Sequence, residues 1–293
     1  MNISEFRKNI INKGRCTKHG ISGNVNIKVH GFGVGGCFTI LFNWLALFGD
    51  DVDNIYVEVS DEWKQTLGVN KNIFDLILDQ KKLHNANEIT IFGHHLINFN
   101  DEILNDIRSI INKKIKIKPE ILKKLDDYLL SNDIKDINSL CGVHVRLTDM
   151  AEYHKGVYGN INFSTYLNEM EKLNNNVKFF IASDNAESIG KLKNKFKNRI
   201  HYIEGIGRVN KETEHGEVVV LTNNKKKFEL GITRLNNDEK IINDFIDLLA
   251  LSKCNKIIGM KYSIYKIAAL LLSNTITQNN NIELPLNFKL KNE

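Results

Sequence analysis

The sequence alternates short apolar runs with longer segments in which apolar residues recur at the spacing of a helix. Strands that alternate with helices in this way predict a parallel β-sheet covered by helices, so the fold class we expect is α/β. The predicted strands are residues 24–30, 54–60, 88–92, 140–146, 177–183, 199–203 and 255–260. The predicted helices lie near residues 37–48, 71–80, 100–113, 118–131, 163–173, 185–197, 238–252 and 263–273.

A polar, charged segment separates these elements into two groups. It covers residues 112–138, contains Pro119 and comes directly before the strand predicted at 140–146. In a chain of 293 residues with 42% hydrophobic residues, each half has enough apolar material for its own core. We therefore place a domain boundary near residue 135 and expect two Rossmann-like domains, residues 1–135 and residues 136–293.

Composition narrows the classes of protein. A formal net charge of +5, spread along the chain, suits an anionic small ligand as well as nucleic acid. The cysteines lie far apart without a CxxC pair, which argues against a disulfide framework and a zinc site; they are Cys16, Cys37, Cys141 and Cys254. No stretch approaches the roughly 18 apolar residues of a membrane-spanning helix, and the polar start lacks the apolar centre of a secretory signal. We therefore expect a soluble, cytoplasmic protein.

The stretch "CGVHVRLTDM", residues 141–150, joins an apolar strand to polar side chains. His144 and Arg146 are two residues apart, so in a strand they point to the same side. They would lie at the carboxyl end of a buried strand, the edge where open α/β sheets bind ligands, and the fork of Arg146 suits phosphate oxygens. Such a pair can hold a diphosphate. The alternative is that Arg146 forms a surface ion pair with Asp149 and that His144 is a hydrogen-bonded core residue.

Two further predicted strands end in polar residues at the same edge. The strand at 177–183 runs into Ser183 and Asp184, which we expect to cap the next helix and leave its first amide groups facing the crevice. The strand at 255–260 is followed by a turn in which Ser263 opens another helix. Three successive strand ends thus predict one anion-binding crevice.

These motifs resemble those of a known family. The segments "GVHVRLTD", "FFIASDN" and "DLLALSKCNKIIGMKYSIYKIAAL" follow one another along the chain. In this order they resemble the three motifs of the fucosyltransferase superfamily, which includes α1,2-, α1,6- (among them nodulation) and protein-O-fucosyltransferases. The resemblance covers essentially the whole C-terminal half. It implies the GT-B architecture, with an acceptor-side N-terminal domain and a C-terminal domain that binds a GDP-sugar.

The resemblance implies roles for individual residues. Arg146 would bind the β-phosphate, and Ser263 would add a phosphate contact at a helix start. His144 and Asp247 would contact the guanine nucleoside, and a carboxylate can accept paired hydrogen bonds from the N1 and N2 groups of guanine, which adenine lacks. The alternative for Asp247 is a solvated helix position.

The N-terminal segment "GFGVGGCFTILFNWLALF" resembles the glycine-rich loop and first helix of the same family. Gly33 and Gly35 would let backbone amides approach the nucleotide or acceptor, although a plain strand-to-helix turn explains them equally well. Ser183 and Asp184 are also assigned to the GDP-sugar site, with Asp184 shaping the crevice.

The sequence departs from the family pattern after Arg146. Leu147 stands where many members carry a second arginine, which leaves the choice between the α1,2/α1,6 and the protein-O type open. The run "DMAEYHKG" also differs from the family, so we name two candidates for the general base, Glu152 and His154, either of which is otherwise an ordinary loop residue. The catalytic residues we predict are therefore Arg146, Glu152 and His154.

The family transfers sugar with inversion and without a metal, which implies a GDP-sugar donor, most often GDP-fucose, and no cofactor. The sequence shows no DxD-like carboxylate pair and no His/Cys cluster that demands a metal. The acceptor we expect is a soluble or lipid-linked glycan, and peripheral membrane association is compatible with the second. The His pair at 94–95 is interpreted as a loop feature.

Two other classes of protein remain as alternatives. A kinase, phosphatase or nucleotide-sugar modifying enzyme would also use a doubly wound sheet, but the chain lacks a GxxxxGK[ST] loop. A nucleic-acid-binding protein is supported only by "KNKFKNR" and "NNKKKF", which have no interleaved aromatic residues and read as solvated faces. The long connection at 204–236 contains two apolar runs around an Asn-Asn-Lys turn, which predicts a β-hairpin that either closes over the site or packs on the surface.

Overall fold

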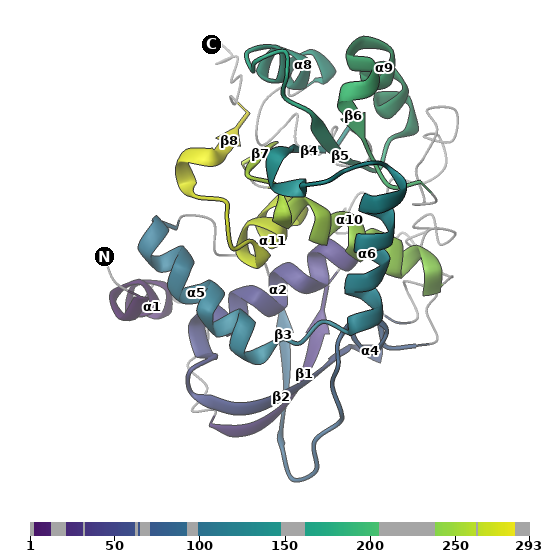
Figure 1. Cartoon of the computed structure of the whole chain (residues 1–293). Coiled ribbons are helices and arrows are strands. Elements are labelled where there is room, and N and C mark those ends of the chain that lie inside the picture. Colours follow the sequence, from purple (N-terminus) through teal and green to yellow (C-terminus); the bar gives the residue numbers. More distant parts are fainter. Residues whose placement is uncertain are drawn as a thin grey trace, which may run out of the picture.

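The computed structural model describes residues 3–12, 22–31, 33–61, 64, 71–92, 99–147, 162–204, 238–261 and 263–284. Two parallel β-sheets with helices against them form an α/β fold, as predicted from the sequence (Figure 1). The first sheet lies at the bottom of Figure 1 and the second at the top, with helices between them.

The first sheet consists of β1 (Gly23–His30), β2 (Val52–Val59) and β3 (Asn87–Phe92), in the order β2-β1-β3. Both pairings are parallel, and β1 is central. Helix α2 (Gly33–Phe48) follows β1 directly, and from Val34 to Phe48 every residue is buried. A helix that is apolar on all sides must be enclosed by other elements. It is enclosed by the first sheet and by α4 (Ile73–Ile77), α5 (Asp101–Lys114) and helices of the C-terminal half.

The second sheet has the strand order β6-β5-β4-β7-β8 and is also parallel throughout. Its strands are β4 (Cys141–Val145), β5 (Phe179–Ser183), β6 (Ile200–His201), β7 (Lys256–Gly259) and β8 (Asn281–Glu283). The associated helices are α6 (Pro119–Ser131), α8 (Phe163–Glu171), α9 (Ala186–Phe196), α10 (Asp238–Lys253) and α11 (Ile264–Leu272), with short 3₁₀ turns η1 (Ile137–Ser139), η2 (Lys197–Arg199) and η5 (Gln278–Asn280). The central strand β4 is buried along its whole length.

Helices α10 and α11 join the two halves of the chain. Helix α11 packs against α2 and α5, and α10 packs against α2, α4 and α6. The buried guanidinium of Arg108 on α5 donates hydrogen bonds to the carbonyl oxygens of Leu270 and Ile276, at 2.8 and 2.6 Å. One hydrophobic core therefore continues from the first sheet into the C-terminal helices. The domain boundary near residue 135 stays a prediction.

Several element boundaries differ from the sequence prediction. The helix expected at 37–48 begins at Gly33, because the glycine-rich run forms its first turns. The helix expected at 71–80 ends at Ile77, and Leu78 then forms a β-bridge with Ile117. The strand expected at 199–203 is reduced to the two residues of β6. Helix α1 (Ile3–Asn12) and strand β8 were not predicted, since β8 is too short to give a sequence pattern.

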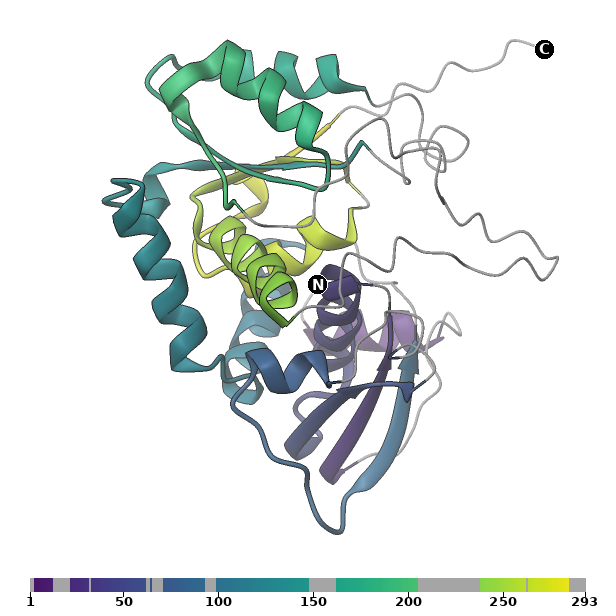
Figure 2. The same cartoon turned by 90° about the vertical axis from the view of Figure 1, so that its right-hand side faces the viewer.

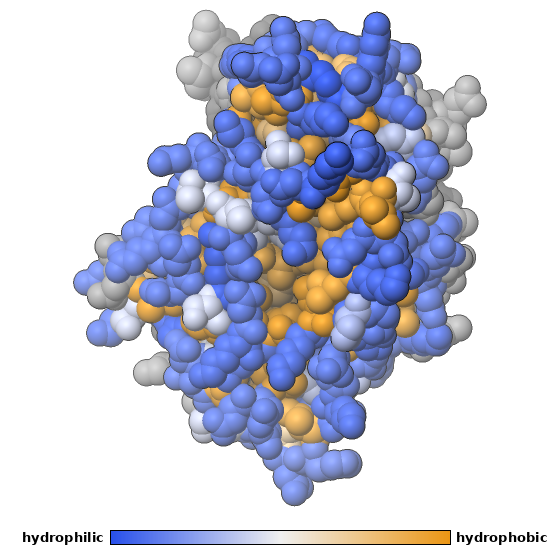
Figure 3. Space-filling view, in the orientation of Figure 1, coloured by the Kyte–Doolittle hydropathy of each residue, from blue (hydrophilic) through white to orange (hydrophobic). Residues whose placement is uncertain are grey.

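The face seen in Figure 1 is mostly hydrophilic, with hydrophobic residues showing in its hollowed middle beside α6 (Figure 3). Leu122 and Leu130 of α6 are exposed by 38% and 82%. In Figure 2 the strands of the second sheet run away from α6, so their carboxyl ends lie on the opposite side of the molecule from this face. None of the helices that the structure describes is both long and apolar enough to cross a membrane.

Candidate functional site

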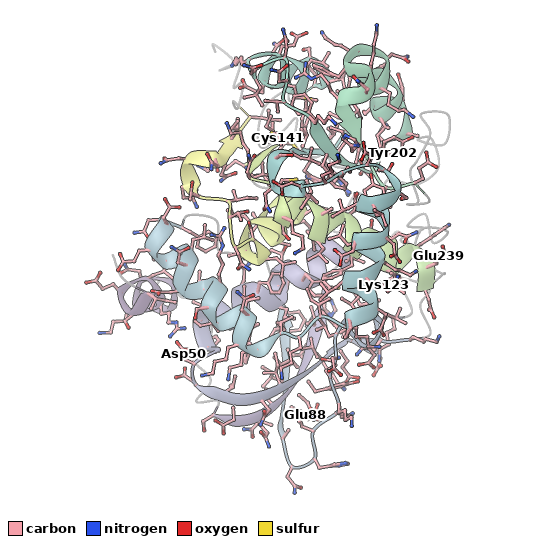
Figure 4. The ribbon with its side chains drawn as sticks, viewed as in Figure 1. Asp50, Glu88, Lys123, Cys141, Tyr202 and Glu239 are labelled. Atoms are coloured by element: carbon pink, nitrogen blue, oxygen red, sulfur yellow. The ribbon has the colours of Figure 1, made fainter. Side chains whose placement is uncertain are left out.

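The carboxyl end of β4 places His144 against the start of α11. The imidazole Nδ1 of His144 lies 2.8 Å from the hydroxyl oxygen of Ser263. The ring also stacks on Tyr265, with the centroids 5.0 Å apart and the planes within 15°. Figure 4 labels Cys141, which is the first residue of β4. The site lies at the other end of this strand.

Burial keeps His144 neutral. The side chain is buried, and burial, with smaller contributions from Arg146 and Lys266, lowers its pKa to about 3. A neutral imidazole with its hydrogen on Nε2 can accept a hydrogen bond from Ser263 at Nδ1. The expectation of a hydrogen-bonded core histidine therefore describes its environment, whereas a contact with guanine stays a prediction.

Arg146 follows β4 and pairs with a residue at the end of the neighbouring strand. Its Nη1 lies 2.8 Å from Oδ2 of Asp184, and the two side chains are exposed by 30% and 12%. The backbone N–H of Arg146 donates to the buried hydroxyl of Tyr166, at 3.3 Å. These contacts hold the guanidinium at the carboxyl edge of the sheet, and its contact with a phosphate stays a prediction. The alternative partner, Asp149, lies outside the described residues.

The N-cap of α9 is Asn185, not Ser183 or Asp184 as the sequence suggested. The side chain of Asn185 accepts a hydrogen bond from the backbone N–H of Ser188, at 2.7 Å. The Ser183 hydroxyl accepts from the backbone N–H of Asn185, at 3.1 Å. Because Asn185 takes the cap position, the carboxylate of Asp184 can turn to Arg146. The N-terminus of α9 still opens at this edge of the sheet.

Ser263 is the N-cap of α11, as predicted. Its hydroxyl accepts a hydrogen bond from the backbone N–H of Lys266, at 3.3 Å, while also contacting His144. The first amide groups of α11 therefore start beside the ends of β4 and β7. A helix N-terminus in this position favours a negatively charged group.

Asp247 lies on α10 and is 2% exposed. The alternative of a solvated helix position is therefore wrong. Helix α10 packs on β4 and β5 and against α11, which puts Asp247 in the C-terminal core region. A guanine contact stays a prediction for this residue.

The predicted glycines differ in their surroundings. Gly33 has a φ of +61°, a conformation that favours glycine, and an added Cβ there would meet nothing within 4 Å. An added Cβ at Gly35 would lie 2.4 Å from Cδ2 of Tyr265, so this glycine lets the first turn of α2 approach α11. Nearby, the Thr39 hydroxyl contacts the carbonyl oxygen of Ile264 at 2.6 Å. Gly35 thus supports the ring on which His144 stacks, and a donor contact for either glycine stays a prediction.

The sequence analysis missed three contributors to this site: Tyr166, Tyr265 and Lys266. Lys266 is the most unexpected, because its side chain is 1% exposed in the apolar helix α11. One feature of the sequence pointed to Lys266: it lies three residues after the predicted cap Ser263, in the first turn of the helix. The tyrosines gave no local signal, since they act through residues distant in the sequence.

A second group of side chains gathers at the carboxyl edge of the first sheet. The Nδ1 of His30, at the end of β1, lies 3.2 Å from the hydroxyl oxygen of Ser60, which follows β2. The His30 ring also contacts Phe92, at the end of β3, with centroids 4.9 Å apart. Phe92 is 64% exposed, so this edge presents an aromatic ring to solvent.

Several predicted features lie outside the described residues. They are Glu152 and His154, the His pair at 94–95 and the hairpin expected within 204–236, and they stay predictions. Within the described part of the chain, no group of three or more His, Cys, Asp and Glu side chains could hold a metal ion. The thiols of Cys37, Cys141 and Cys254 are buried and form no disulfide.

Comparison with solved structures finds fucosyltransferases. The crystal structure of NodZ α-1,6-fucosyltransferase co-crystallized with GDP is 15% identical, covers 88% of this chain and 93% of that chain, and gives a TM-score of 0.48. Fucosyltransferase NodZ from Bradyrhizobium is 16% identical, with a coverage of 88% and 94% and a TM-score of 0.47. POFUT1 in complex with GDP is 11% identical, with a coverage of 61% and 50% and a TM-score of 0.34. No protein-family model matches the chain, and no curated protein matches it significantly. At these identities and TM-scores, the similar structures place no residue of this site.

Proposed function

We propose that the protein is a glycosyltransferase that moves a sugar from a GDP-sugar to a hydroxyl group of a glycan. The observation that carries the proposal is the arrangement of Arg146, Asp184 and Ser263 at adjoining strand ends. It combines a guanidinium with the N-terminus of α11, both suited to phosphate oxygens, in the order of motifs that resembles the fucosyltransferase superfamily. By that resemblance the transferred sugar is fucose.

The reaction is a displacement at the anomeric carbon of the sugar. The acceptor oxygen forms a bond to this carbon while the bond from the carbon to the β-phosphate oxygen breaks, and the electron pair leaves with GDP. Negative charge therefore grows on the diphosphate in the transition state. In the proposed complex, Arg146 and the first amide groups of α11 stabilise that charge as it develops.

A general base removes the proton of the acceptor hydroxyl. Such a base typically contributes about 10²- to 10⁴-fold to the rate. Glu152 and His154 are the candidates, because they follow the phosphate-binding strand in the sequence. His144 is excluded from this role: its ring is buried and its pKa is lowered to about 3, so it is a poor proton acceptor near neutral pH. We propose inversion at the anomeric carbon and no requirement for a metal ion, both from the resemblance.

A thermal-shift panel tests the nucleotide. A ligand that binds only the folded protein raises its stability, so GDP should raise the melting temperature while UDP, ADP and an oligonucleotide leave it unchanged. A response to ADP or to the oligonucleotide in place of GDP would contradict the proposal and favour another nucleotide-binding enzyme or a nucleic-acid-binding protein. The donor sugar is then identified by measuring GDP release from GDP-fucose and from GDP-mannose over a set of glycan acceptors.

A further inference from the structure

Lys266 is a buried lysine whose charge is poorly satisfied by the described part of the chain. Its side chain is 1% exposed, and its ammonium makes one described hydrogen bond, to the carbonyl oxygen of Gly259 at 3.4 Å. The same carbonyl already accepts a hydrogen bond from the backbone N–H of Leu284, at 3.1 Å. An ammonium group has three donors, and burying it without partners costs free energy.

The position of Lys266 brings this charge to the proposed donor site. The residue lies in the first turn of α11, and its backbone N–H donates to the cap residue Ser263. Its side chain lies across Gly259: a Cβ added there would be 3.0 Å from Cδ of Lys266 and 3.4 Å from the carbonyl oxygen of His144. The lysine side chain therefore extends from the first turn of α11 to the ends of β4 and β7.

The other described cations at this edge each have a carboxylate partner. Arg146 pairs with Asp184 at 2.8 Å, and Lys261 pairs with Glu283 at 3.4 Å. Among the described residues, the hydrogen-bond partner of the Lys266 ammonium is a carbonyl oxygen, so it adds a positive charge to this edge that no described ion pair balances. An anion at the N-terminus of α11 would balance it.

Burial and the neighbouring charged groups set the pKa of Lys266. Burial is the main cause that lowers its pKa to about 8; Lys261 lowers the pKa further, and Glu283 on β8 opposes the shift. Among the elements packed against α11, α2 carries no Asp, Glu, Lys, Arg or His. Helix α5 brings Arg108 to the opposite end of α11, and α10 carries the buried Asp247.

We infer that Lys266 is an electrostatic positioning residue for the donor: its ammonium, carried by the first turn of α11, balances the diphosphate, and donor binding shifts this lysine fully to its protonated form. The inference rests on the proposed function. Before the donor binds, Lys266 is a neutral amine in a fraction of the protein molecules. On donor binding, these amines take up a proton from the solvent. The diphosphate in turn stabilises the ammonium form by Coulomb attraction in a site from which water is largely excluded.

Calorimetric titration with GDP at about pH 8.5 tests the inference, because the second ionisation of a phosphate, with a pKa of about 6, is then complete. Titrations in buffers of different ionisation enthalpy give the number of protons taken up per GDP. A lysine with a pKa near 8 is about one quarter protonated at this pH, so full protonation requires an uptake of roughly three quarters of a proton per GDP. The wild-type protein should show this uptake, and it should disappear at about pH 6.5.

Two variants and a control assign the proton. Lys266→Met should abolish the uptake and weaken GDP binding about tenfold at neutral pH, whereas Lys266→Arg should abolish the uptake but keep most of the affinity, because a guanidinium is always charged. The control Lys253→Met changes an exposed lysine at the end of α10 and should behave as wild type.

The outcomes separate this inference from the proposed function. Wild-type protein that binds GDP without proton uptake, or Lys266→Arg protein with undiminished uptake, would overturn the role of Lys266 and leave the proposed function standing. Wild-type protein that does not bind GDP would overturn both. If Lys266→Met does not fold, the wild-type and Lys266→Arg titrations still show whether Lys266 takes up the proton.

Discussion

The carboxyl edges of the two sheets are built from different chemistry. At the second sheet, His144 is buried and held by Ser263, and Arg146 is held by Asp184. At the first sheet, His30 contacts Ser60 and the ring of Phe92, which is 64% exposed. The same βα topology thus gives one edge that encloses a buried histidine and a partly buried ion pair, and another, open edge that carries an exposed aromatic ring together with surface ion pairs such as Lys64 with Asp61.

This difference fits a division of labour in the proposed reaction. A diphosphate needs fixed positive charge and amide donors, which are most effective where water is excluded. A glycan acceptor presents hydroxyl groups and apolar C–H faces, for which a hydroxyl, an imidazole and an aromatic ring are suitable partners. We therefore propose that the second edge binds the donor and the first edge binds the acceptor. Substitutions at each edge test this assignment.

The largest effect should come from Arg146→Lys. Lysine keeps the charge but loses the planar fork that stabilises the leaving diphosphate, so transfer should fall by about 100-fold or more while the protein stays folded. Steady-state transfer rates and a melting curve measure this. The matched control is Arg199→Lys, since Arg199 donates to the carbonyl oxygen of Val177 at the other end of β5. A wild-type rate for Arg146→Lys would remove the phosphate role.

The next effect concerns Asp247 and the choice of nucleotide. Asp247→Asn replaces an acceptor with donors that face the donors of guanine, so GDP binding should weaken by about 1 to 3 kcal/mol. The control is Asp238→Asn on the same helix, because Asp238 is exposed and forms a surface ion pair with Lys71. Unchanged GDP affinity in folded Asp247→Asn protein, measured by calorimetry, would reject the guanine contact.

Gly35→Ala should disturb the contact between the two halves of the chain. The new methyl group would lie 2.4 Å from the ring of Tyr265, so the free energy of unfolding should fall by about 1 to 3 kcal/mol. Gly190→Ala is the control: nothing lies within 4 Å of that position in α9, and alanine should raise the stability by about 0.5 to 1 kcal/mol. Denaturant unfolding measures the stability of both variants. A Gly35→Ala protein that is as stable as wild type, or more stable, would contradict the packing described for Gly35.

Acid should lower the free energy of unfolding of the protein through His144. The unfolded residue takes up a proton below its ordinary pKa of about 6.5, whereas burial keeps the folded residue neutral down to about pH 3. The unfolded state therefore binds more protons in this range, and stability falls as the pH falls, by at most about 1.4 kcal/mol per pH unit. Between about pH 6.5 and 5, His144→Gln should show a shallower loss than wild type, whereas His84→Gln, at an exposed position, should follow the wild-type curve. Parallel curves for wild type and His144→Gln would contradict this.

The smallest effect should come from the open edge. Phe92→Ala removes an exposed ring, so the KM for the acceptor should rise about threefold while the GDP affinity and the stability stay unchanged. Leu130→Ala, at a position that is 82% exposed on α6, is the control on the opposite face. An equal change in donor affinity for Phe92→Ala would show that the two edges do not divide the substrates.

The α/β class and the positions of most strands follow from local sequence patterns. The apolar run at 140–146 matches β4 closely, because a parallel strand that is buried along its length must be apolar. The runs at 24–30 and 88–92, in which polar and apolar residues alternate, match β1 and the edge strand β3, each of which has exposed or partly exposed positions. Local patterns also located Arg146 and the cap Ser263, since strand ends and helix starts are marked by residues close together in the chain.

The partners of these groups are set by the tertiary fold. Asp184 pairs with Arg146 across 38 positions of sequence, and His144 reaches Ser263 across 119. The ring of Tyr265 fills the space left by Gly35, and Lys266 is buried in a helix whose sequence gives no partner for its charge. Such contacts depend on which strands are neighbours and how closely helices approach, and local sequence patterns carry neither kind of information.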